Sequence, residues 1–591
     1  MQEKTQQLLP QTQADTIPLV PASASEGGKW KSKAWRGMGV FLCAAAVGSV
    51  MGFPPWDGGK EEVMKSAVRC PKQMQALGKG PGFHVSPNYT DLVTSRLSRA
   101  VQIPAVSYDD MGPVDTDPRW EPHFKFQKFL EDEYPAVQVA PVSEYSSCAC
   151  ANGLSIKYRY GTLKHEMVNT HGHLFTWEGT DKALQPLLLM AHSLAHSENI
   201  GLQDVVPVLP ATLDKWTHPP FEGKIDDEWV WGRGSADCKN QLMGIMNAVE
   251  KLVQDGFKPE RTIILSFGFD EEIGGYQGAS YLAETIQERY GEQSLAFLVD
   301  EGFGGVDTAF GAKFASLGMA EKGATNLKIT VETPGGHSSV PPEHTAIGIL
   351  SKLLVHLEAN PFEPSLTAAS PYLKYLTCLA DHAPDVGKDF VKSVKNPKRW
   401  AKLAKQLAKQ SPQNRAFLAT TQAIDLISGG VKVNALPEVA TGDTSSIDET
   451  TQHAVTLLSP LVHKLGFEFI AFNKTIRGAS CPHALALQSA AAAEGKRITL
   501  DIVRGAKGTP GLEPAPITPT DTESFELIGS TIKKVFGDDV VVAPSAMFAN
   551  TADFRNPHTV DEAMSIKGHL TTVEFFYQLL QNTAGWKQGS E

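Results

Sequence analysis

Between about residues 120 and 315, short continuous apolar runs alternate with patterns of helical period. Apolar residues from Leu242 to Val253 recur at helical spacing, and Gly256 ends that pattern. The runs with the length and composition of strands buried on both faces are PLLLM (186–190), TIILSF (262–267) and LAFLV (295–299). This alternation predicts an α/β domain with a mostly parallel central sheet.

Near residue 320 the pattern changes. In NLKITVE (326–332) apolar and polar residues alternate, which predicts a half-exposed antiparallel strand. We therefore expect a smaller α+β domain over 321–505, inserted between two parts of the first domain, 121–320 and 506–591. The prolines that mark the return to the first domain are Pro510, Pro514, Pro516 and Pro519.

The N-terminal region has the pattern of a membrane anchor. Residues 37–53 form an uncharged run of a length at the short end for a membrane span. Lysines and an arginine precede this run and acids follow it, which predicts a cytoplasmic tail (1–36), one transmembrane helix (37–53) and a lumenal remainder. A cleaved signal peptide is the alternative, but the run starts late. Residues 54–120 look like a loosely packed lead-in, and the sequons at Asn88 and Asn473 fit a lumenal location.

Composition narrows the possible partners. The net charge of −12 over 591 residues argues against nucleic acid. Seven scattered cysteines form no disulfide framework and no C-x-x-C zinc pair. The stretch PKRWAKLAKQLAKQ (397–410) has an apolar face and a lysine-covered face, which predicts a helix on a domain surface; binding to a membrane surface is the alternative.

The buried runs share one feature: each ends in side chains that can bind metal. His192 follows the first run, Asp270-Glu271-Glu272 the second and Asp300-Glu301 the third, while a Gly-containing loop presents Asp237 before a helix. In open α/β sheets, ligands bind outside the carboxyl ends of the strands. Carboxylates gathered there repel one another, and divalent cations relieve the repulsion, so we predict a metal site. Adjacent Glu271 and Glu272 would point to opposite sides, so that one binds metal and the other takes a proton from a metal-activated water.

The order of these motifs resembles that of the carboxypeptidase S family, the fungal vacuolar Gly-Xaa carboxypeptidases, within the di-zinc superfamily that includes aminoacylases and glutamate carboxypeptidase. The resemblance covers about residues 120–580 and extends to the anchor. It rests on LLLMAH with DVVPV, WGRGSADCKNQL, FGFDEEIGG, FLVDEG, PGGHSSVPP, VNALPE and PHTVDE.

The resemblance implies a role for each matching residue. Two zinc ions would be held by His192, Asp237, Glu272, Asp300 and His558, with Asp237 as the bridge. Glu271 would be the general base, and Asp204 would orient the zinc-binding histidine. His337 would stabilise the oxyanion, often across a dimer formed by a lid domain, and Asn434 would contact substrate. We expect Cys238, beside Asp237, and His569, farther along the chain from His558, to be structural.

The sequence departs from the family pattern in four places. Ten extra residues, 193–202, separate His192 from Asp204, and the strand register favours His192 over His196 as the ligand. Residues 138–160 are a second insertion. Segments 439–450, which lacks the expected arginine, and 548–562, where Arg555 could partly substitute, are short. Our hypothesis is that some of these departures are gene-model errors; sequencing a transcript across 137–204 tests it.

The predicted function is a vacuolar, membrane-anchored di-zinc metallocarboxypeptidase that hydrolyses the C-terminal peptide bond of short peptides. Gly-Xaa preference rests on the resemblance alone. One alternative is an aminoacylase-like hydrolase of N-acyl amino acids, which would use the same metal residues. The other is a catalytically impaired homologue that acts as a binding protein, which the broken spacing after His192 would favour. Oxygen and histidine ligands suit zinc, although cobalt or manganese would also fit.

Overall fold

The computed structural model describes residues 69–105, 108, 111–137, 162–193, 210–301, 306–445, 449–476, 491–504, 511–546 and 553–587. The predicted anchor (37–53), the insertion 138–160, Asp204 and nearly all of the insertion 193–202 lie outside these residues. Within the described ranges, no helix is both long and apolar enough to cross a membrane.

The central sheet has five strands in the order β1-β2-β5-β3-β6. The three predicted runs form β3 (Leu187–His192), β5 (Ile263–Gly268) and β6 (Phe297–Val299), and these strands are parallel. β1 (Lys164–Val168) and β2 (Gly172–Trp177) join them as an antiparallel hairpin on β5. The sheet is therefore mixed rather than mostly parallel, because the chain turns back tightly between β1 and β2 through positive φ angles at Asn169 and Thr170.

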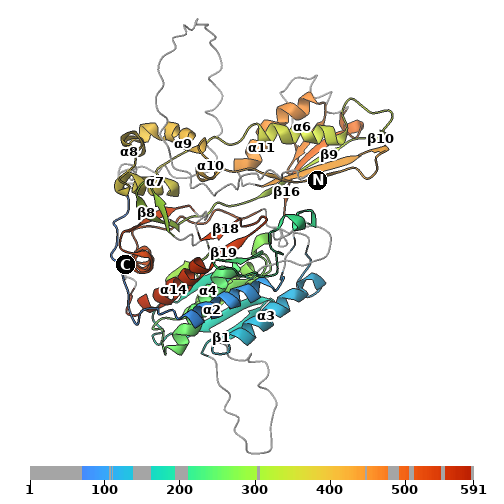
Figure 1. Ribbon diagram of the computed structural model, residues 1–591. Coiled ribbons are helices and arrows are strands. Elements are labelled where there is room, and N and C mark those ends of the chain that lie inside the picture. Colours follow the sequence, from blue (N-terminus) through green and yellow to red (C-terminus); the bar gives the residue numbers. More distant parts are fainter. Residues whose placement is uncertain are drawn as a thin grey trace, which may run out of the picture.

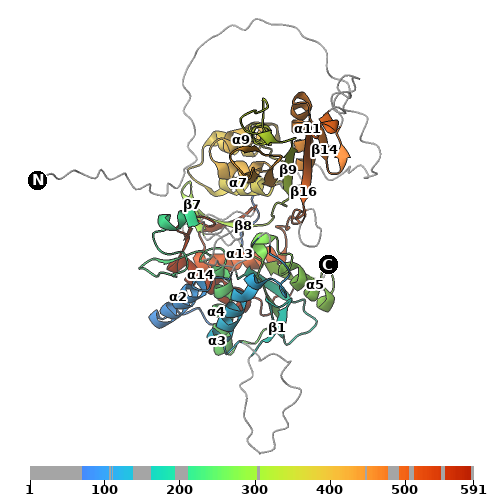
Figure 2. The same ribbon diagram turned by 90° about the vertical axis from the view of Figure 1, so that its right-hand side faces the viewer.

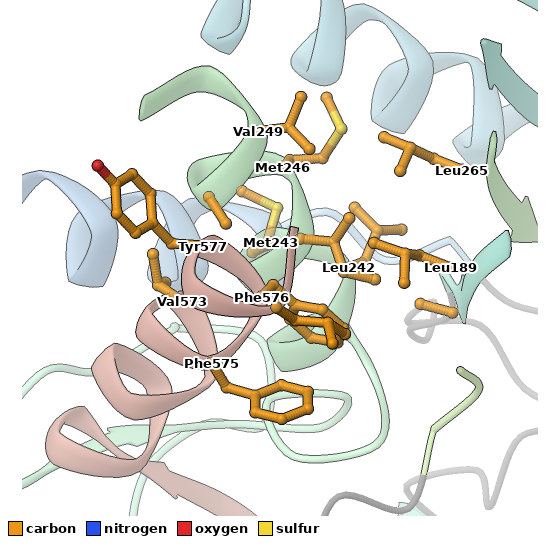
Figure 3. Close-up of a cluster of buried hydrophobic side chains, with 14 of the residues drawn as sticks. Leu189, Leu242, Met243, Met246, Val249, Leu265, Val573, Phe575, Phe576 and Tyr577 are labelled. Carbon is orange, nitrogen blue, oxygen red and sulfur yellow. The ribbon is translucent and has the colours of Figure 1, made fainter. Parts of the chain in front are cut away.

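Helices cover both faces of this sheet (Figure 1). The predicted 242–253 helix is α4 (Lys239–Gln254), and it packs against α14 (Ile566–Asn582) and α2 (Pro87–Val101). Figure 3 shows the contact, in which side chains of α4 and α14 interdigitate next to Leu189 and Leu265 of the strands. A Cβ on Gly244 would lie 2.7 Å from Thr572 Cγ2, so glycine permits this close approach. On the other face, α5 (Ala279–Tyr290) buries Leu282 and Ile286.

A second, smaller sheet links this unit to a helical region. β7 (Val306–Ala309), β8 (Ala312–Gly318) and β17 (Val540–Ser545) form the sheet, and α13 (Glu523–Phe536) contacts β17. The helices that share a core with Phe314 and Val541 of this sheet are α7 (Pro371–His382), α8 (Lys388–Val394), α9 (Trp400–Ala408) and α10 (Pro412–Leu418). Within α9, Trp400, Leu403 and Leu407 are buried and the lysines are exposed. The apolar face of this basic helix therefore packs inside the protein, as predicted for a domain-surface helix.

A further set of strands and helices builds an α+β unit at the upper right of Figure 1. Its strand order is β11-β13-β9-β16-β14-β15, and α6 (Ala346–Glu358) and α11 (Glu449–Lys464) contact the sheet. NLKITVE is strand β9 (Asn326–Glu332), antiparallel to both neighbours and buried at Leu327, Ile329 and Val331, which confirms that prediction. The strands around it are β11 (Ile424–Gly429), β13 (Val439–Ser445), β16 (Arg497–Val503), β14 (Glu468–Ala471) and β15 (Lys474–Thr475). Figure 2 shows this unit and the helical region side by side above the central sheet.

The described part of the lead-in is firmly attached, contrary to the prediction of loose packing. A disulfide joins Cys70 to Cys378 of α7, 308 residues away, a pairing that scattered cysteines did not reveal. The Gln73 side chain accepts a hydrogen bond from the backbone N–H of Val542 (2.8 Å) and donates to its carbonyl (3.1 Å), so it continues the ladder at the edge of β17. Farther along, Asn582 of α14 hydrogen-bonds Leu77 and Lys79.

Candidate metal centre

The metal-binding side chains meet at one edge of the central sheet. His192 is the last residue of β3, Glu271 and Glu272 begin the 3-10 turn η4 (Glu271–Ile273) after β5, and Glu301 follows β6. These three strands are parallel neighbours, so their carboxyl ends coincide. Asp237 comes from the loop that precedes α4.

Asp237 lies between two histidines. Its Oδ1 is 3.2 Å from His192 Nε2, and its Oδ2 is 3.0 Å from His558 Nε2. On the first side, Glu301 Oε2 lies 3.0 Å from His192 Nε2; on the second, Glu272 Oε1 lies 3.2 Å from His558 Nε2. The potential ligand atoms form three candidate groups, each within the span that a single ion can bridge. The groups around His192 with Glu301 and around His558 with Glu272 share the carboxylate of Asp237.

The charges in this cluster indicate that it is built for cations. Burial by itself would raise the pKa of Asp237, but hydrogen bonds from His192 and His558 lower it. Hydrogen bonds to Asp237 and Glu272 raise the pKa of His558 to about 11. Burial would lower the pKa of His192, yet Cys238, Glu301 and Asp237 together raise it well above its ordinary value. The carboxylates thus favour positive charge on both imidazoles, and a divalent ion held between the imidazoles and the carboxylates would compensate the same negative charge.

The structure favours Glu301 over the predicted ligand Asp300. Glu301 belongs to the group around His192, and Asp300 does not belong to any of the candidate groups. The reason is the alternation of an extended chain: successive side chains after β6 point to opposite sides, so only one of the two neighbours can face His192. The stretch DEG (300–302) has two adjacent carboxylates, as the pair Glu271 and Glu272 has. The same argument from alternation would have raised the choice between Asp300 and Glu301 from the sequence.

Glu271 belongs to the third candidate group, with His192 and Glu272. Its Oε2 lies 3.7 Å from His192 Nε2, and its side chain remains about half exposed, at 48%. Burial of the remainder, together with the nearby carboxylates of Glu301, Glu272 and Asp237, raises the pKa of Glu271 to about 8. A carboxyl group beside the metal ligands with a pKa near neutrality has the properties required of a proton acceptor.

Two neighbouring residues have structural surroundings, as the sequence suggested. Cys238 is buried, its Sγ accepts a hydrogen bond from the backbone N–H of His192 at 3.4 Å, and burial raises the pKa of its thiol. Its Sγ nevertheless lies within the group around His192. His569 is buried beside Asn240, 2.7 Å from Nδ1 to Oδ1, and burial lowers its pKa to about 4.

The predicted orienting residue Asp204 lies outside the described residues. Among the described residues, nothing hydrogen-bonds the buried Nδ1 of His192, the atom that such a carboxylate would contact. His196 also lies outside. The choice of His192 over His196 therefore rests on the contacts that His192 makes with Asp237 and Glu301.

His337 and Asn434 lie together, but on the other unit. β10 (Gly336–His337) pairs with β12 (Ala435–Leu436), and the backbone N–H of Ser338 donates to the Asn434 carbonyl at 3.3 Å. His337 is exposed, and its Nδ1 contacts the Ser339 hydroxyl at 2.7 Å. Figure 1 places β10 at the far end of the upper unit, away from the central sheet. In this arrangement the ribbon of β10 and β12 does not reach the metal centre of its own chain.

Comparison with known proteins identifies the family of this chain. The description "Peptidase family M20/M25/M40" matches residues 203–582. Carboxypeptidase S of Saccharomyces cerevisiae is 33% identical over 580 residues, which cover 90% of this chain and 92% of that protein. The N-fatty-acyl-amino acid synthase/hydrolase PM20D1 of Mus musculus is 27% identical over 84% of this chain and 88% of that protein. The crystal structure of the di-peptidase Dug1p from Saccharomyces cerevisiae has a TM-score of 0.51 at 14% identity, covering 85% of this chain and 98% of that one.

The chain belongs to peptidase family M20/M25/M40. The resemblance to carboxypeptidase S inferred from the motifs is confirmed, and so is the assignment to the hydrolases of peptide bonds.

Proposed function

We propose that this protein is a zinc-dependent carboxypeptidase that removes the C-terminal residue of short peptides, with a preference for Gly-Xaa bonds. The observation that carries the proposal is the position of Asp237 between His192 and His558, with Glu271 beside them. The printed name and high coverage of carboxypeptidase S support the reaction. The donor set of imidazoles and carboxylates suits zinc.

The chain's own residues account for the proton transfers. His192, Asp237 and Glu301 would hold one zinc ion, and Asp237, Glu272 and His558 the other. The ions supply Lewis-acid activation of water and of the scissile carbonyl. Glu271 accepts the proton of the attacking water and passes one to the leaving amine. The positive charge of the ions would hold the Glu271 carboxyl ionised at neutral pH, against burial and the neighbouring carboxylates, which raise its pKa.

Arg555 is our candidate for the group that binds the substrate carboxylate. It is exposed in β18 (Phe554–Arg555), close in sequence to His558, and its guanidinium stacks on Trp229 with 3.9 Å from Cζ to the ring centroid. Stacking fixes the guanidinium plane and leaves its edge free for a carboxylate. Among the described residues, no carboxylate forms an ion pair with it. This supports a role in place of the arginine that 439–450 lacks.

His337 and Asn434 would complete the site after a movement of the upper unit or from a second subunit, with His337 stabilising the oxyanion. A homodimer formed by the upper unit, acting as lid and dimerisation domain, is supported by its edge strand β11. Ile427 in this strand is 61% exposed, Val355 of α6 is 62% exposed, and Val431 and Val433 are fully exposed. Exposed apolar groups at a sheet edge suit pairing with another chain.

We further propose a vacuolar, lumenal location with the anchor at 37–53. The Cys70–Cys378 disulfide supports an oxidising compartment for the catalytic part. The two sequons are compatible with it.

A second candidate is hydrolysis of N-acyl amino acids, favoured by the similarity to the synthase/hydrolase PM20D1. Purified protein loaded with zinc should be assayed on N-blocked Gly-Xaa dipeptides and on N-fatty-acyl amino acids, with Glu271→Ala as the matched control. Faster turnover of the dipeptides supports the carboxypeptidase, and faster turnover of the acyl amino acids supports the alternative. No turnover of either substrate by the zinc-loaded protein would favour the remaining alternative, a binding protein. Turnover that survives Glu271→Ala would instead overturn the role of Glu271.

A further inference from the structure

One fully buried ion pair lies next to the metal centre and takes no part in the proton transfers described above. Arg233 Nη1 lies 2.5 Å from Glu562 Oε2, and the two side chains are 2% and 0% exposed. Removing two such charges from water costs roughly several kcal/mol per ion, so a buried pair is retained only with excellent geometry and additional hydrogen bonds.

Those additional hydrogen bonds run to the loop that carries Asp237. The second oxygen of Glu562, Oε1, accepts from the backbone N–H of Ala236 at 3.0 Å and of Asp237 at 3.2 Å. The Glu562 carbonyl also accepts from the backbone N–H of Gly232 at 2.8 Å. Glu562 therefore fixes the backbone from which the Asp237 carboxylate projects.

The other partner reaches the loop that carries His558. Arg233 Nη2 donates to the Thr559 carbonyl at 3.2 Å. This loop is strained, because three of its non-glycine residues have positive φ: Asn556 (51°), His558 (64°) and Asp561 (62°). Each such residue costs about 1–3 kcal/mol and persists only where surrounding contacts hold it. One ion pair thus links two loops that are distant in sequence and that present adjacent metal-binding side chains.

We propose that Arg233 and Glu562 are positioning residues that set the relative placement of Asp237 and His558. They thereby set the metal affinity of the site that Asp237, Glu272 and His558 form. This inference rests on the proposed metal-dependent function. The pair acts through the backbone of both loops, so it controls a distance between ligands rather than contributing a ligand. Residues that orient metal ligands typically change metal affinity by about 10–100-fold when they are replaced.

The test uses the full chain in detergent and measures Zn²⁺ affinity by competition with a chromophoric chelator, well below the unfolding temperature. Glu562→Gln removes the charge, and Arg233→Lys keeps the charge but cannot reach both Glu562 and Thr559. We expect zinc binding at one of two sites to weaken by about 10–100-fold in both variants. If Glu562→Gln does not fold, Arg233→Lys carries the test alone.

A matched control is the second buried arginine–glutamate pair, Arg96 with Glu250, 2.7 Å apart with both side chains 7% exposed. Arg96 contacts Asn247, Glu133 and Glu250 but none of the proposed metal ligands. Arg96→Lys and Glu250→Gln should lower the unfolding temperature without changing zinc affinity. Wild-type zinc affinity in Arg233→Lys and Glu562→Gln, together with lowered thermal stability, would make the pair merely structural and overturn the inference. Absence of zinc binding by the wild-type chain would instead overturn the proposed function, and the inference with it.

Discussion

The metal centre and the ribbon of β10 and β12 would serve one active site, but they are built in opposite ways. The metal centre is formed by the ends of three packed strands and by two loops linked through the buried pair of Arg233 and Glu562. The ribbon consists of two two-residue strands, and His337 on it is exposed. Its own hydrogen bonds hold its shape, yet no contact between described residues holds it near the metal centre.

This contrast has a physical meaning. Metal ligands must be preorganised, because ions demand fixed distances between donor atoms. A group that stabilises charge only during the reaction can arrive with a moving unit, which also admits substrate and releases product. The five predictions below, ordered from the largest expected effect to the smallest, test whether the site divides into a fixed half, the metal centre, and a half that moves, the ribbon of β10 and β12.

The largest effect should come from the metal ligand after β6, for which the structure favours Glu301 and the family resemblance implied Asp300. Glu301→Ala should lower the affinity for one zinc ion by more than about 100-fold. Replacing a residue that only orients a ligand lowers metal affinity by up to about 100-fold, and loss of a ligand should cost more. Asp300→Ala should leave two zinc ions bound. Metal content after dialysis, measured by elemental analysis, separates the two assignments. Full zinc content in Glu301→Ala with loss in Asp300→Ala would restore the assignment made from the sequence.

The sequence revealed most of the fixed half and little of the mobile half. Buried strands leave long apolar runs, and polar residues at their ends are visible by position, so His192, Asp237, Glu271 and Glu272 could be found without a structure. Asp300 was assigned from the resemblance, and the residue pattern alone does not fix which of two adjacent carboxylates turns inward. Arg233 and Glu562 were missed because each looks like an ordinary charged residue until the fold brings the two together. The placement of His337 rested on resemblance alone, since an exposed two-residue strand has no periodicity.

The mobile half can be tested at His337. His337→Ala should lower kcat by about 10²–10³-fold, the usual effect of losing one oxyanion donor, with zinc content unchanged. Steady-state kinetics and elemental analysis on the same sample check both statements. A loss of zinc would place His337 in the fixed half and break the comparison.

Mixing variants decides whether His337 acts within its own chain or across a dimer. Glu271→Ala and His337→Ala chains, each nearly inactive, are mixed under conditions that allow subunits to exchange. If His337 acts across the dimer, the mixture should recover about a quarter of wild-type activity, because about half of random dimers are mixed and each has one complete site. Recovery should be absent if the unit closes over its own chain.

A smaller effect is expected at Arg555, which is attached to the fixed half but would contact only substrate. Arg555→Ala should raise KM by about 10–100-fold, as expected for losing a charge-assisted hydrogen bond, with little change in kcat. Arg555→Lys should recover part of the loss. Arg399→Ala is the control, since Arg399 is exposed and pairs with Asp389 on the distant helical region. An unchanged KM in Arg555→Ala would exclude this residue from carboxylate binding.

The smallest effect concerns the stability of the fold in acid. It distinguishes the central unit, which holds the metal centre, from the upper α+β unit. Buried histidines gather on β1, β2, the turn between them and α3 (Glu121–Glu133): His123 and His171 lie beside Trp120 and Phe269, and His165 stacks on His173. Burial lowers the pKa of His123 to about 3 and the pKa values of His165 and His171 to about 4. In the upper α+β unit, no described histidine is buried.

The sign of the effect follows from linkage. An unfolded chain binds protons at these histidines below about pH 6.5, whereas the folded chain does so only near pH 3–4. The free energy of unfolding should therefore fall as the pH drops from about 6.5 to 4, by roughly 1.4 kcal/mol per pH unit for each histidine.

Both ring nitrogens of His171 are buried without hydrogen-bond partners among the described residues, so His171→Phe removes one titrating group without breaking a hydrogen bond. Denaturant unfolding between pH 4.5 and 6.5 should show a shallower slope for His171→Phe and an unchanged slope for the exposed control His382→Phe. Equal slopes in the wild type, His171→Phe and His382→Phe would mean that the buried histidines of the central unit remain accessible to protons. This unit would then be less tightly closed than its packing indicates.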